Sequence, residues 1–251
     1  MAGSALKTGA LAAALRRSPG DQPLPWRLRF VPVCASTERE LEHWLAAGEP
    51  PPLAVCARHQ RHGHGQQGRI WQSPAGGVWL SAALPWPLDP SGAASLALAA
   101  AVGLALELEA LGLKPQIKWP NDLLLGGRKL AGILPRLRWR GGQVRYAQVG
   151  VGINGVNRVP PGAINLAEAL GQRRHPLAHP SRLAACVLRG LEWTAAAAQQ
   201  PELVRRQAEQ RLWRPEWIEH NGACWSVVGL SSDGGLRICR GSERVVLQRA
   251  F

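Results

Sequence analysis

The stretch KWPNDLLLGGRKLAGIL, Lys118–Leu134, brings together two lysines, an Asn-Asp pair and two turn signals. The chain has only four lysines among its 30 basic residues, so a lysine kept here indicates a need for a compact ammonium rather than a planar guanidinium. Pro120 fixes its own φ and pushes Trp119 toward extended geometry. We therefore predict that a strand ends at Trp119 and that Asn121-Asp122 turns out of it.

A β-hairpin is predicted directly after this turn. Leu123–Leu125 form its first strand, Gly126-Gly127 its two-residue connection and Arg128–Leu134 its returning strand. Strict alternation along the returning strand would place Lys129 and Gly132 on opposite faces. A lysine projecting from a rigid strand beside a closed site can stabilise a carboxylate and a phosphate as they approach each other. The alternative is a surface hairpin with solvated lysines.

A second segment, RHQRHGHGQQGRIWQSP (residues 58–74), contains the pattern Gly-x-Gly-x-x-Gly. A dinucleotide-binding fold requires a helix directly after the third glycine, whereas Gly68 is followed by RIWQSP and the strand-like GGVWLSAAL. We therefore predict a mobile loop, called the glycine loop below (residues 63–69), whose glycines let backbone N–H groups approach a ligand.

The region around the glycine loop also holds a set of residues typical of metal sites, Cys56, His59, His62 and His64. Structural zinc sites usually have tighter paired spacings, and no second pair lies elsewhere in the chain. We predict no metal site here.

Four motifs follow one another between about residues 30 and 170. They are VCASTERELEHWL (33–45), the glycine loop, KWPND with GRKLAGIL, and VGVGIN (149–154). Their order resembles that of the biotin protein ligases, enzymes that attach biotin to a lysine of a carrier domain. The resemblance implies an α+β fold, with a class II synthetase-like catalytic domain in which helices flank a mixed β-sheet. It also implies ATP, biotin and Mg²⁺ as the small molecules involved.

The resemblance implies roles for individual residues. Lys129 would be the catalytic residue, reducing the repulsion between the biotin carboxylate and the α-phosphate of ATP, and a lysine of the carrier would then attack biotinyl-AMP. The residues implied in biotin binding are Ser36, Thr37, Glu38, Gln60, Gly63, His64, Gly65, Gln66, Lys129 and Gly132. Those implied in nucleotide binding are Arg69, Trp71, Lys118, Asn121, Asp122 and Asn154. For the polar residues the alternative is a structural role as satisfied turn residues.

The glycine loop departs from the family pattern, which usually reads Gly-Arg-Gly-Arg-Arg-Gly. This chain has His64, Gln66 and Gln67 at the three arginine positions and keeps Arg69. A hydrogen bond from Arg to a charged oxygen contributes about 1.5–3 kcal/mol, so we expect weaker retention of an acyl-adenylate unless another arginine substitutes. His64 and Gln66 leave open a biotin- or nucleotide-binding homologue with weak or no ligase activity. A lipoate or octanoate transferase of the same fold is the other alternative, although KWPND and GRKLAGIL argue against it.

Composition is typical of a cytoplasmic enzyme. A chain of 251 residues that is 46% hydrophobic can bury a core and leave room for one main and one small domain. Its five cysteines include no Cys-x-x-Cys, which indicates reduced thiols. Two arginines follow the apolar run of the first twenty residues, so this segment reads as a frayed helix or tail rather than a secretory signal. The apolar run 93–106 is too short to span a membrane and predicts a buried helix.

Hydrophobic periodicity and the positions of turn-forming residues divide the chain into a tail (1–25), a catalytic domain (26–212) and a small C-terminal β domain (213–251). The domain at 213–251 resembles a shortened SH3-like β-barrel of the family. Predicted strands of the catalytic domain include 53–58, 77–85, 115–119, 129–139 and 144–154, and predicted helices cover 38–47, 91–111, 181–199 and 201–211. A short helix is predicted to begin near 164–166. The predicted C-terminal strands are 225–230, 236–239 and 245–247.

The formal net charge of +13 raises the possibility of a nucleic-acid-binding protein. Some biotin ligases carry an N-terminal DNA-binding domain, but only about 30 residues precede Ser36 and Thr37, so we expect the monofunctional type. We interpret the charge as attraction for ATP and for an acidic biotin carboxyl carrier domain of acetyl-CoA carboxylase. No nucleic-acid or membrane partner is expected, and the protein is expected to be a monomer or homodimer.

Overall fold

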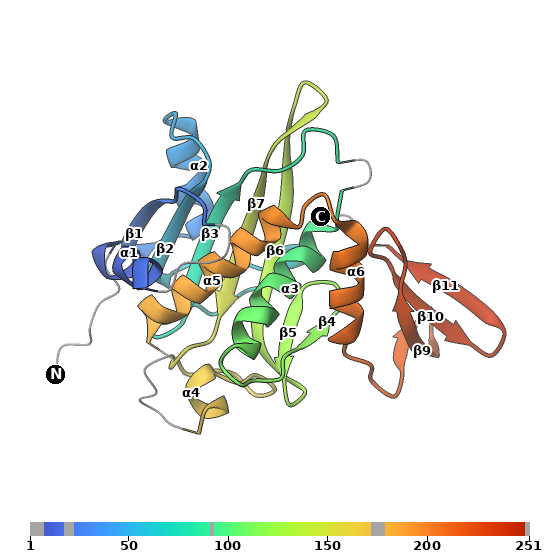
Figure 1. Ribbon diagram of the computed structural model, residues 1–251. Helices are drawn as coiled ribbons and strands as arrows, with labels where there is room; N and C mark the ends of the chain where they lie inside the picture. The colour runs from blue at the N-terminus through green and yellow to red at the C-terminus, as the bar shows by residue number, and fades with distance from the viewer. Residues whose placement is uncertain (1–7, 18–22, 91–92, 172–178, 249–251) are drawn as a thin grey trace.

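A seven-stranded mixed sheet forms the centre of the computed structural model, which describes residues 8–17, 23–90, 93–171 and 179–248 (Figure 1). Its strand order is β1-β2-β3-β7-β6-β5-β4, with β1 parallel to β2 and all other pairs antiparallel. The strands are β1 (Arg27–Cys34), β2 (Leu53–Gln60), β3 (Val78–Leu84), β4 (Gln116–Lys118), β5 (Asp122–Leu125), β6 (Arg128–Arg140) and β7 (Gln143–Ile153). The predicted α+β class with a mixed sheet is confirmed. Strand β1 was not predicted.

The hairpin expected from the Gly-Gly pair is confirmed. Gly126 and Gly127 both have positive φ, 55° and 74°, and connect Leu125 to its partner Arg128. The predicted alternation along the returning strand is wrong, because Leu123 pairs with Ala131 and the next residue of β5 pairs with Lys129. The extra residue between these partners is a β-bulge, which turns Lys129 and Gly132 toward the same side of the sheet.

Helices cover both faces of the sheet (Figure 1). Helix α2 (Thr37–Ala46) buries Leu41 against Leu53 and Val55 of β2, whereas the alternating residues Ala54 and Cys56 belong to the larger core. That larger core is formed with α3 (Leu96–Glu109) and α5 (Pro180–Ala196). Two further helices follow β7 and α5 in the chain, α4 (Leu166–Ala169) and α6 (Pro201–Gln210). The face near α2 is therefore left partly open.

Helix α3 is buried along almost its whole length, as its apolar sequence predicts. It begins at Leu96, later than predicted, and residues 91 and 92 lie outside the described part of the chain. Gly103 lets it cross α5 closely, because a Cβ there would lie 2.1 Å from the carbonyl oxygen of Gly190. No described helix combines the length and apolar character that crossing a bilayer requires.

Helix α1 (Thr8–Arg17) lies in the segment expected to be a frayed helix or tail. Leu11 on this helix is only 2% exposed and belongs to the main core, and the helix lies next to α5 and β1. This part of residues 1–25 therefore packs against the domain that was expected to begin at residue 26.

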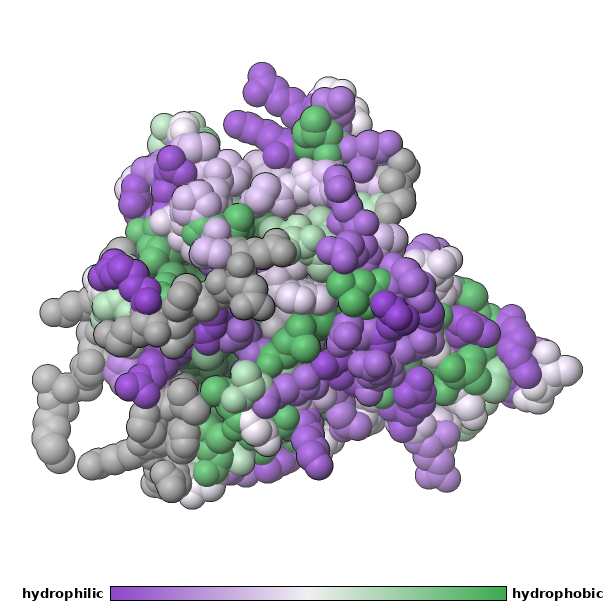
Figure 2. All heavy atoms as spheres, viewed as in Figure 1, coloured by the Kyte–Doolittle hydropathy of each residue, from purple (hydrophilic) through white to green (hydrophobic). Residues whose placement is uncertain are grey.

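The C-terminal residues form a separate four-stranded antiparallel sheet in the order β11-β10-β9-β8. Its strands are β8 (Ile218–His220), β9 (Ala223–Leu230), β10 (Leu236–Arg240) and β11 (Glu243–Leu247). A small C-terminal β unit was expected, but the sheet has two edges and is not a closed barrel. The turn between β9 and β10 contacts the segment that follows β4, since the indole Nε1 of Trp119 donates to the carbonyl oxygen of Gly234 at 2.9 Å. Hydrophilic residues predominate over the neighbouring helix α6 (Figure 2).

Glu192 on α5 is a buried carboxylate whose removal is expected to stabilise the protein. Oε1 accepts from the Trp26 indole at 2.8 Å and from the Leu24 backbone at 3.2 Å, whereas Oε2 is buried without a hydrogen-bond partner among the described residues. Burial raises the pKa of Glu192, since water would stabilise the charged form better. The contribution of this group to the free energy of unfolding is therefore fully present below its ordinary pKa, where the carboxyl group is protonated. It is lost as the pH rises through the raised pKa, because the buried group then becomes charged.

We expect Glu192→Gln to raise the melting temperature at pH 7.5 by about 2–4 °C, with the gain shrinking toward pH 4. Calorimetry across this pH range measures the effect. The exposed Glu216→Gln serves as a control that removes the same charge. A gain that does not depend on pH, or one equal to that of the control, would contradict the prediction.

Candidate functional site

A pocket of about 440 Å³ opens on the face of the sheet near α2. Its walls come from α2, the glycine loop, β3, β5, β6, β7 and the loop before α4. The lining residues predicted from sequence are Ser36, Thr37, Glu38, Gln60, His64, Gly65, Gln66, Arg69, Trp71, Lys118, Asn121, Asp122, Lys129, Gly132 and Asn154. Gly63 is the one predicted residue that does not line it. A Cβ there would lie 2.5 Å from the Ser73 hydroxyl, so Gly63 is packed behind the wall.

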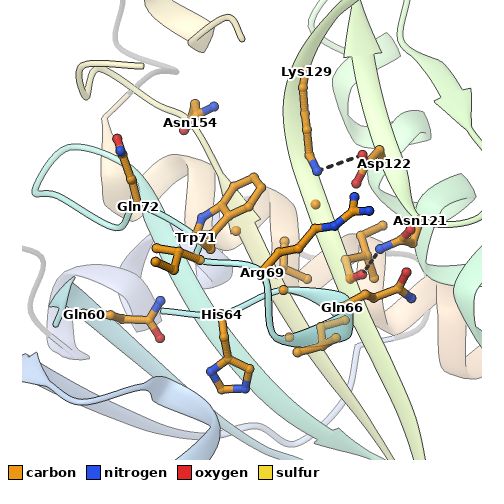
Figure 3. A pocket seen from close by; sticks show the side chains of 18 of the residues that line it. Gln60, His64, Gln66, Arg69, Trp71, Gln72, Asn121, Asp122, Lys129 and Asn154 are labelled. Carbon is orange, nitrogen blue, oxygen red and sulfur yellow. Dashed lines mark hydrogen bonds and ion pairs between the residues drawn. The ribbon is translucent and has the colours of Figure 1, made fainter. Parts of the chain in front are cut away.

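One end of the pocket carries charge. The Nζ of Lys129 lies 2.7 Å from an oxygen of Asp122 and 5.0 Å from the ring centroid of Trp71. In Figure 3 the side chain of Arg69 extends toward this pair. Two cations, Lys129 and Arg69, and the carboxylate of Asp122 thus converge at this end. A bound anion would meet here the ammonium of Lys129, which Asp122 and Trp71 contact from two sides.

The backbone of Lys129 is also fixed. Its N–H donates to the Gly162 carbonyl at 3.1 Å, and its carbonyl accepts from Ile164 at 3.0 Å. The loop between β7 and α4 is therefore hydrogen-bonded to the strand that carries the lysine.

Trp71 lies over a floor of glycines. A Cβ on Gly132 would lie 3.0 Å from its ring, and a Cβ on Gly152 would lie 2.5 Å from its Nε1. Its edge contacts Trp79, with ring centroids 6.4 Å apart. The Nε1 atom is buried without a hydrogen-bond partner among the described residues. A side chain larger than hydrogen at either glycine would displace the indole from beside Lys129.

The other end of the pocket contains a network of hydrogen-bonding hydroxyl and amide groups. Gln60 Oε1 accepts from the backbone of Thr37 at 2.7 Å and from its hydroxyl at 3.0 Å, and Gln60 Nε2 donates to the Ser73 hydroxyl at 2.8 Å. The Thr37 hydroxyl also meets that of Ser81 at 2.8 Å. The Ser36 hydroxyl caps α2 by accepting from Arg39 N at 3.3 Å. These groups are oriented by one another and suit a small polar ring.

The glycine loop contains a single short 3₁₀ turn at Gln66–Gly68, and Arg69 after it is extended. No helix follows Gly68, as expected, so the loop is not a dinucleotide-binding turn. Gln67 has a φ of 57°, a left-handed conformation that non-glycine residues rarely adopt. The His64 imidazole points away from Lys129 in Figure 3 and lies 2.6 Å from Oε2 of Glu38.

Several predicted polar residues are engaged by the protein itself. Asn154 donates from Nδ2 to the Ile164 carbonyl at 3.2 Å and accepts at Oδ1 from Asn157 at 3.0 Å. Asn121 donates to the Ile133 carbonyl at 2.6 Å, and the ammonium of Lys118 lies 5.3 Å from the Trp213 ring centroid. The side chains of Asn121 and Asn154 therefore hydrogen-bond within the protein, as the alternative of a structural role expects. Asp122 instead contacts Lys129 directly.

The cysteines and histidines form no cluster in the described part of the chain that would hold a metal ion. All five cysteines are free. Burial raises the pKa of the Cys56 thiol to about 12, so this residue is a packing group rather than a reactive thiolate.

Some lining residues were not predicted. They are Ile70, Gln72, Leu80, Ser81, Trp119, Pro120, Ile133, Leu134, Gly150, Val151, Gly152, Pro160 and Ala163. The two glycines carried a signal, since their period of two in VGVGIN indicates a flat strip on one face of a strand. The apolar residues carried none that separates them from ordinary core.

Residues 30–154, which contain nearly all of these groups, match the sequence profile of the biotin/lipoate A/B protein ligase family. The chain belongs to this family. Among curated members, it is 35% identical over 157 residues to the bifunctional ligase/repressor BirA of Bacillus subtilis and 37% identical over 142 residues to the biotin–[acetyl-CoA-carboxylase] ligase of Paracoccus denitrificans. These matches cover 58% and 52% of this chain, and 48% and 58% of the two relatives.

Solved structures of family members share the fold. The biotin protein ligase from Aquifex aeolicus in complex with biotin and ATP superposes with a TM-score of 0.69 at 23% identity, covering 88% of this chain and 95% of that one. The ligase from Leishmania major with biotinyl-5-AMP gives 0.62 at 18% identity, covering 90% and 100%. The similarity extends beyond residues 30–154 and confirms the arrangement of mixed sheet, flanking helices and small C-terminal sheet.

Proposed function

We propose that the protein ligates biotin to a lysine of a biotin carrier protein, with ATP as the activating substrate and biotinyl-5′-AMP as the intermediate. The observation that supports this most strongly is the ammonium of Lys129, held between Asp122 and Trp71 at one end of a pocket whose other end offers hydroxyl and amide hydrogen-bonding groups. Family membership and relatives named as biotin ligases support the same reaction.

In the first half-reaction, a carboxylate oxygen of biotin attacks the α-phosphorus of ATP, and pyrophosphate leaves. The two reactants repel each other because both are anions, and Lys129 reduces that repulsion without having to move. Asp122 and Trp71 fix where the ammonium lies. Gln60 and Thr37 at the opposite end suit the ureido ring, which offers two N–H donors and one carbonyl acceptor.

In the second half-reaction, the amine of a carrier lysine attacks the carbonyl carbon of biotinyl-AMP, and AMP leaves. The chain's contribution is to align the intermediate and exclude water from it. The glycine loop forms a wall of the pocket that can perform both tasks.

Mg²⁺ is expected to accompany ATP and to offset charge on its phosphates. The carboxylates among the lining residues are Glu38 and Asp122, and Glu38 is engaged by basic residues. Oxygens of Asp122 and Asn121 fit a supporting role, because Mg²⁺ keeps waters and phosphate oxygens as most of its ligands.

We further propose that the carrier is the biotin carboxyl carrier domain of acetyl-CoA carboxylase and that ligation takes place in the cytoplasm. The formal net charge of +13 favours an acidic protein substrate and attracts ATP. Nothing in the described residues requires a nucleic-acid partner.

The test is to mix the purified protein with ATP, Mg²⁺, biotin and a biotin carboxyl carrier domain, and to follow the label on the carrier with streptavidin. ATP-dependent transfer is expected. Lipoate and octanoate in excess should not compete, and a competing lipoate would instead indicate a transferase for that acid. Biotin binding without transfer would favour the binding-only homologue.

Retention of the intermediate is expected to be weakened by the missing loop arginines. We predict that Gln66→Arg, which adds a cation to the pocket wall, slows release of biotinyl-AMP by about 10- to 100-fold. The matched control is Gln67→Arg, because Gln67 lies on the same turn but is exposed and does not line the pocket. Stopped-flow release rates measure the effect, and equal rates for wild type and Gln66→Arg would refute it.

A further inference from the structure

We propose that Glu38 is a positioning residue that holds the glycine loop closed over the pocket through His64. The inference rests on the proposed function only for its consequence, the retention of biotinyl-AMP. The loop contact itself is independent of what the pocket binds.

The two oxygens of Glu38 contact different parts of the molecule. Oε1 lies 2.8 Å from Nη1 of Arg136 and accepts from Nε2 of Gln148 at 3.0 Å, and Arg138 lies 3.7 Å away. These three partners project from β6 and β7, the rigid strands of the central sheet. Oε2 lies 2.6 Å from Nε2 of His64 on the glycine loop. One carboxylate therefore connects the fixed sheet to the loop.

Burial makes this connection stronger than an ordinary surface pair. Glu38 is 9% exposed, and its position is set by the N-terminus of α2 on one side and by Arg136 on the other. The loop partner does not need to order a mobile carboxylate, so little side-chain entropy is lost when His64 binds. His64 is half-buried. Its second nitrogen makes just one long contact, at 3.5 Å, with the His62 carbonyl oxygen of the same segment.

One departure from the family pattern lies in this contact. The first arginine of the family's loop pattern is His64 here. An arginine lost from the loop removes a cation that can bind a ligand phosphate or carboxylate. Glu38 on α2 gives the histidine that replaces it a partner within the protein, so closure depends on the protein rather than on the ligand.

The neighbouring ion pair between Arg138 and Glu42 provides a matched control. It also joins α2 to β6, but Glu42 is exposed and does not contact the glycine loop. Removal of Glu42 thus loosens the same helix without releasing His64. If the ion pairs of Arg136 and Arg138 served only to stabilise α2, removal of Glu38 and removal of Glu42 would have the same effect on the glycine loop.

Trypsin provides the test in the absence of any ligand, because the exposed Arg61 and Arg69 flank the loop contact. We expect Glu38→Gln and His64→Ala to be cleaved after these arginines about tenfold faster than wild type, as identified by mass spectrometry. Glu42→Gln should be cleaved at the wild-type rate, His64→Arg should retain protection, and the double variant Glu38→Gln/His64→Ala should be no faster than either single one. His64→Ala keeps the test decisive if Glu38→Gln fails to fold, since His64 is near the surface.

The consequence for the ligand is measured separately with chemically synthesised biotinyl-AMP. Its release should be about tenfold faster from His64→Ala and Glu38→Gln, and unchanged in Glu42→Gln. Wild-type cleavage rates in His64→Ala, or equal acceleration in Glu42→Gln and Glu38→Gln, would overturn the proposal. If no variant and not even wild type binds biotinyl-AMP, the proposed function fails while the cleavage comparison still decides the loop contact.

Discussion

Lys129→Ala is expected to slow formation of biotinyl-AMP by about 100- to 1,000-fold while leaving the fold intact. The ammonium is the cation fixed on both sides at the charged end of the pocket, by Asp122 at 2.7 Å and by the Trp71 ring at 5.0 Å. Removal of one preorganised group that stabilises developing charge typically costs this factor. Pyrophosphate release under saturating ATP and biotin measures it.

Two controls accompany this variant. Lys114→Ala removes an exposed lysine outside the pocket and should leave the rate unchanged. Lys129→Ala should transfer biotin from added biotinyl-AMP to the carrier with a smaller loss, because the phosphate–carboxylate repulsion belongs to the first half-reaction. Adenylation at more than about a tenth of the wild-type rate would remove Lys129 from its assigned role.

Gly152→Ala is expected to reduce kcat/KM for adenylation by about 100-fold, although the residue itself carries no chemistry. Its Cβ would lie 2.5 Å from Nε1 and 2.6 Å from Cε2 of Trp71, so the indole must move away from Lys129. A displacement of about 1 Å in groups that position the reacting atoms can cost this much. The reaction rate and the melting temperature should be measured together, since overpacking also destabilises by about 1–3 kcal/mol.

Gly150→Ala is the graded comparison for this effect. It lies two residues earlier on the same strand, and its Cβ would meet Leu134 at 3.3 Å rather than the indole, so its loss should be much smaller. The double variant Gly152→Ala/Trp71→Phe should recover part of the activity, because a smaller ring makes room. Equal losses for the two glycine variants would show that Trp71 is not what Gly152 accommodates.

Local chemistry explains what was predictable from sequence. The Gly126-Gly127 hairpin follows from the need for two positive φ angles, and the α3 helix follows from a long apolar run that meets two glutamates. Motif order brought together residues as distant as Ser36 and Asn154, which periodicity alone would have left unconnected. The prediction that these distant residues share one site therefore depended on the resemblance to the family, because periodicity and local propensity relate only residues that are near in sequence.

Tertiary packing explains what was missed. The bulge on β6 buries Leu130 and Ala131 in succession, and a pattern of alternating residues cannot signal it because both are apolar. Strand β1 is an edge strand with Pro32 in its middle, which weakens the strand signal. The contact between Glu38 and Arg136 joins residues that are far apart in sequence, and neither residue type predicts the other.

The backbone bonds between Lys129 and residues 162 and 164 separate two properties of the chain between β7 and α4. The largely exposed stretch 158–161 can change in composition without moving the ammonium, because both flanks are tied, at Asn157 to Asn154 and at Gly162 to Lys129. The shape of that part of the pocket can therefore change independently of the position of the reactive group.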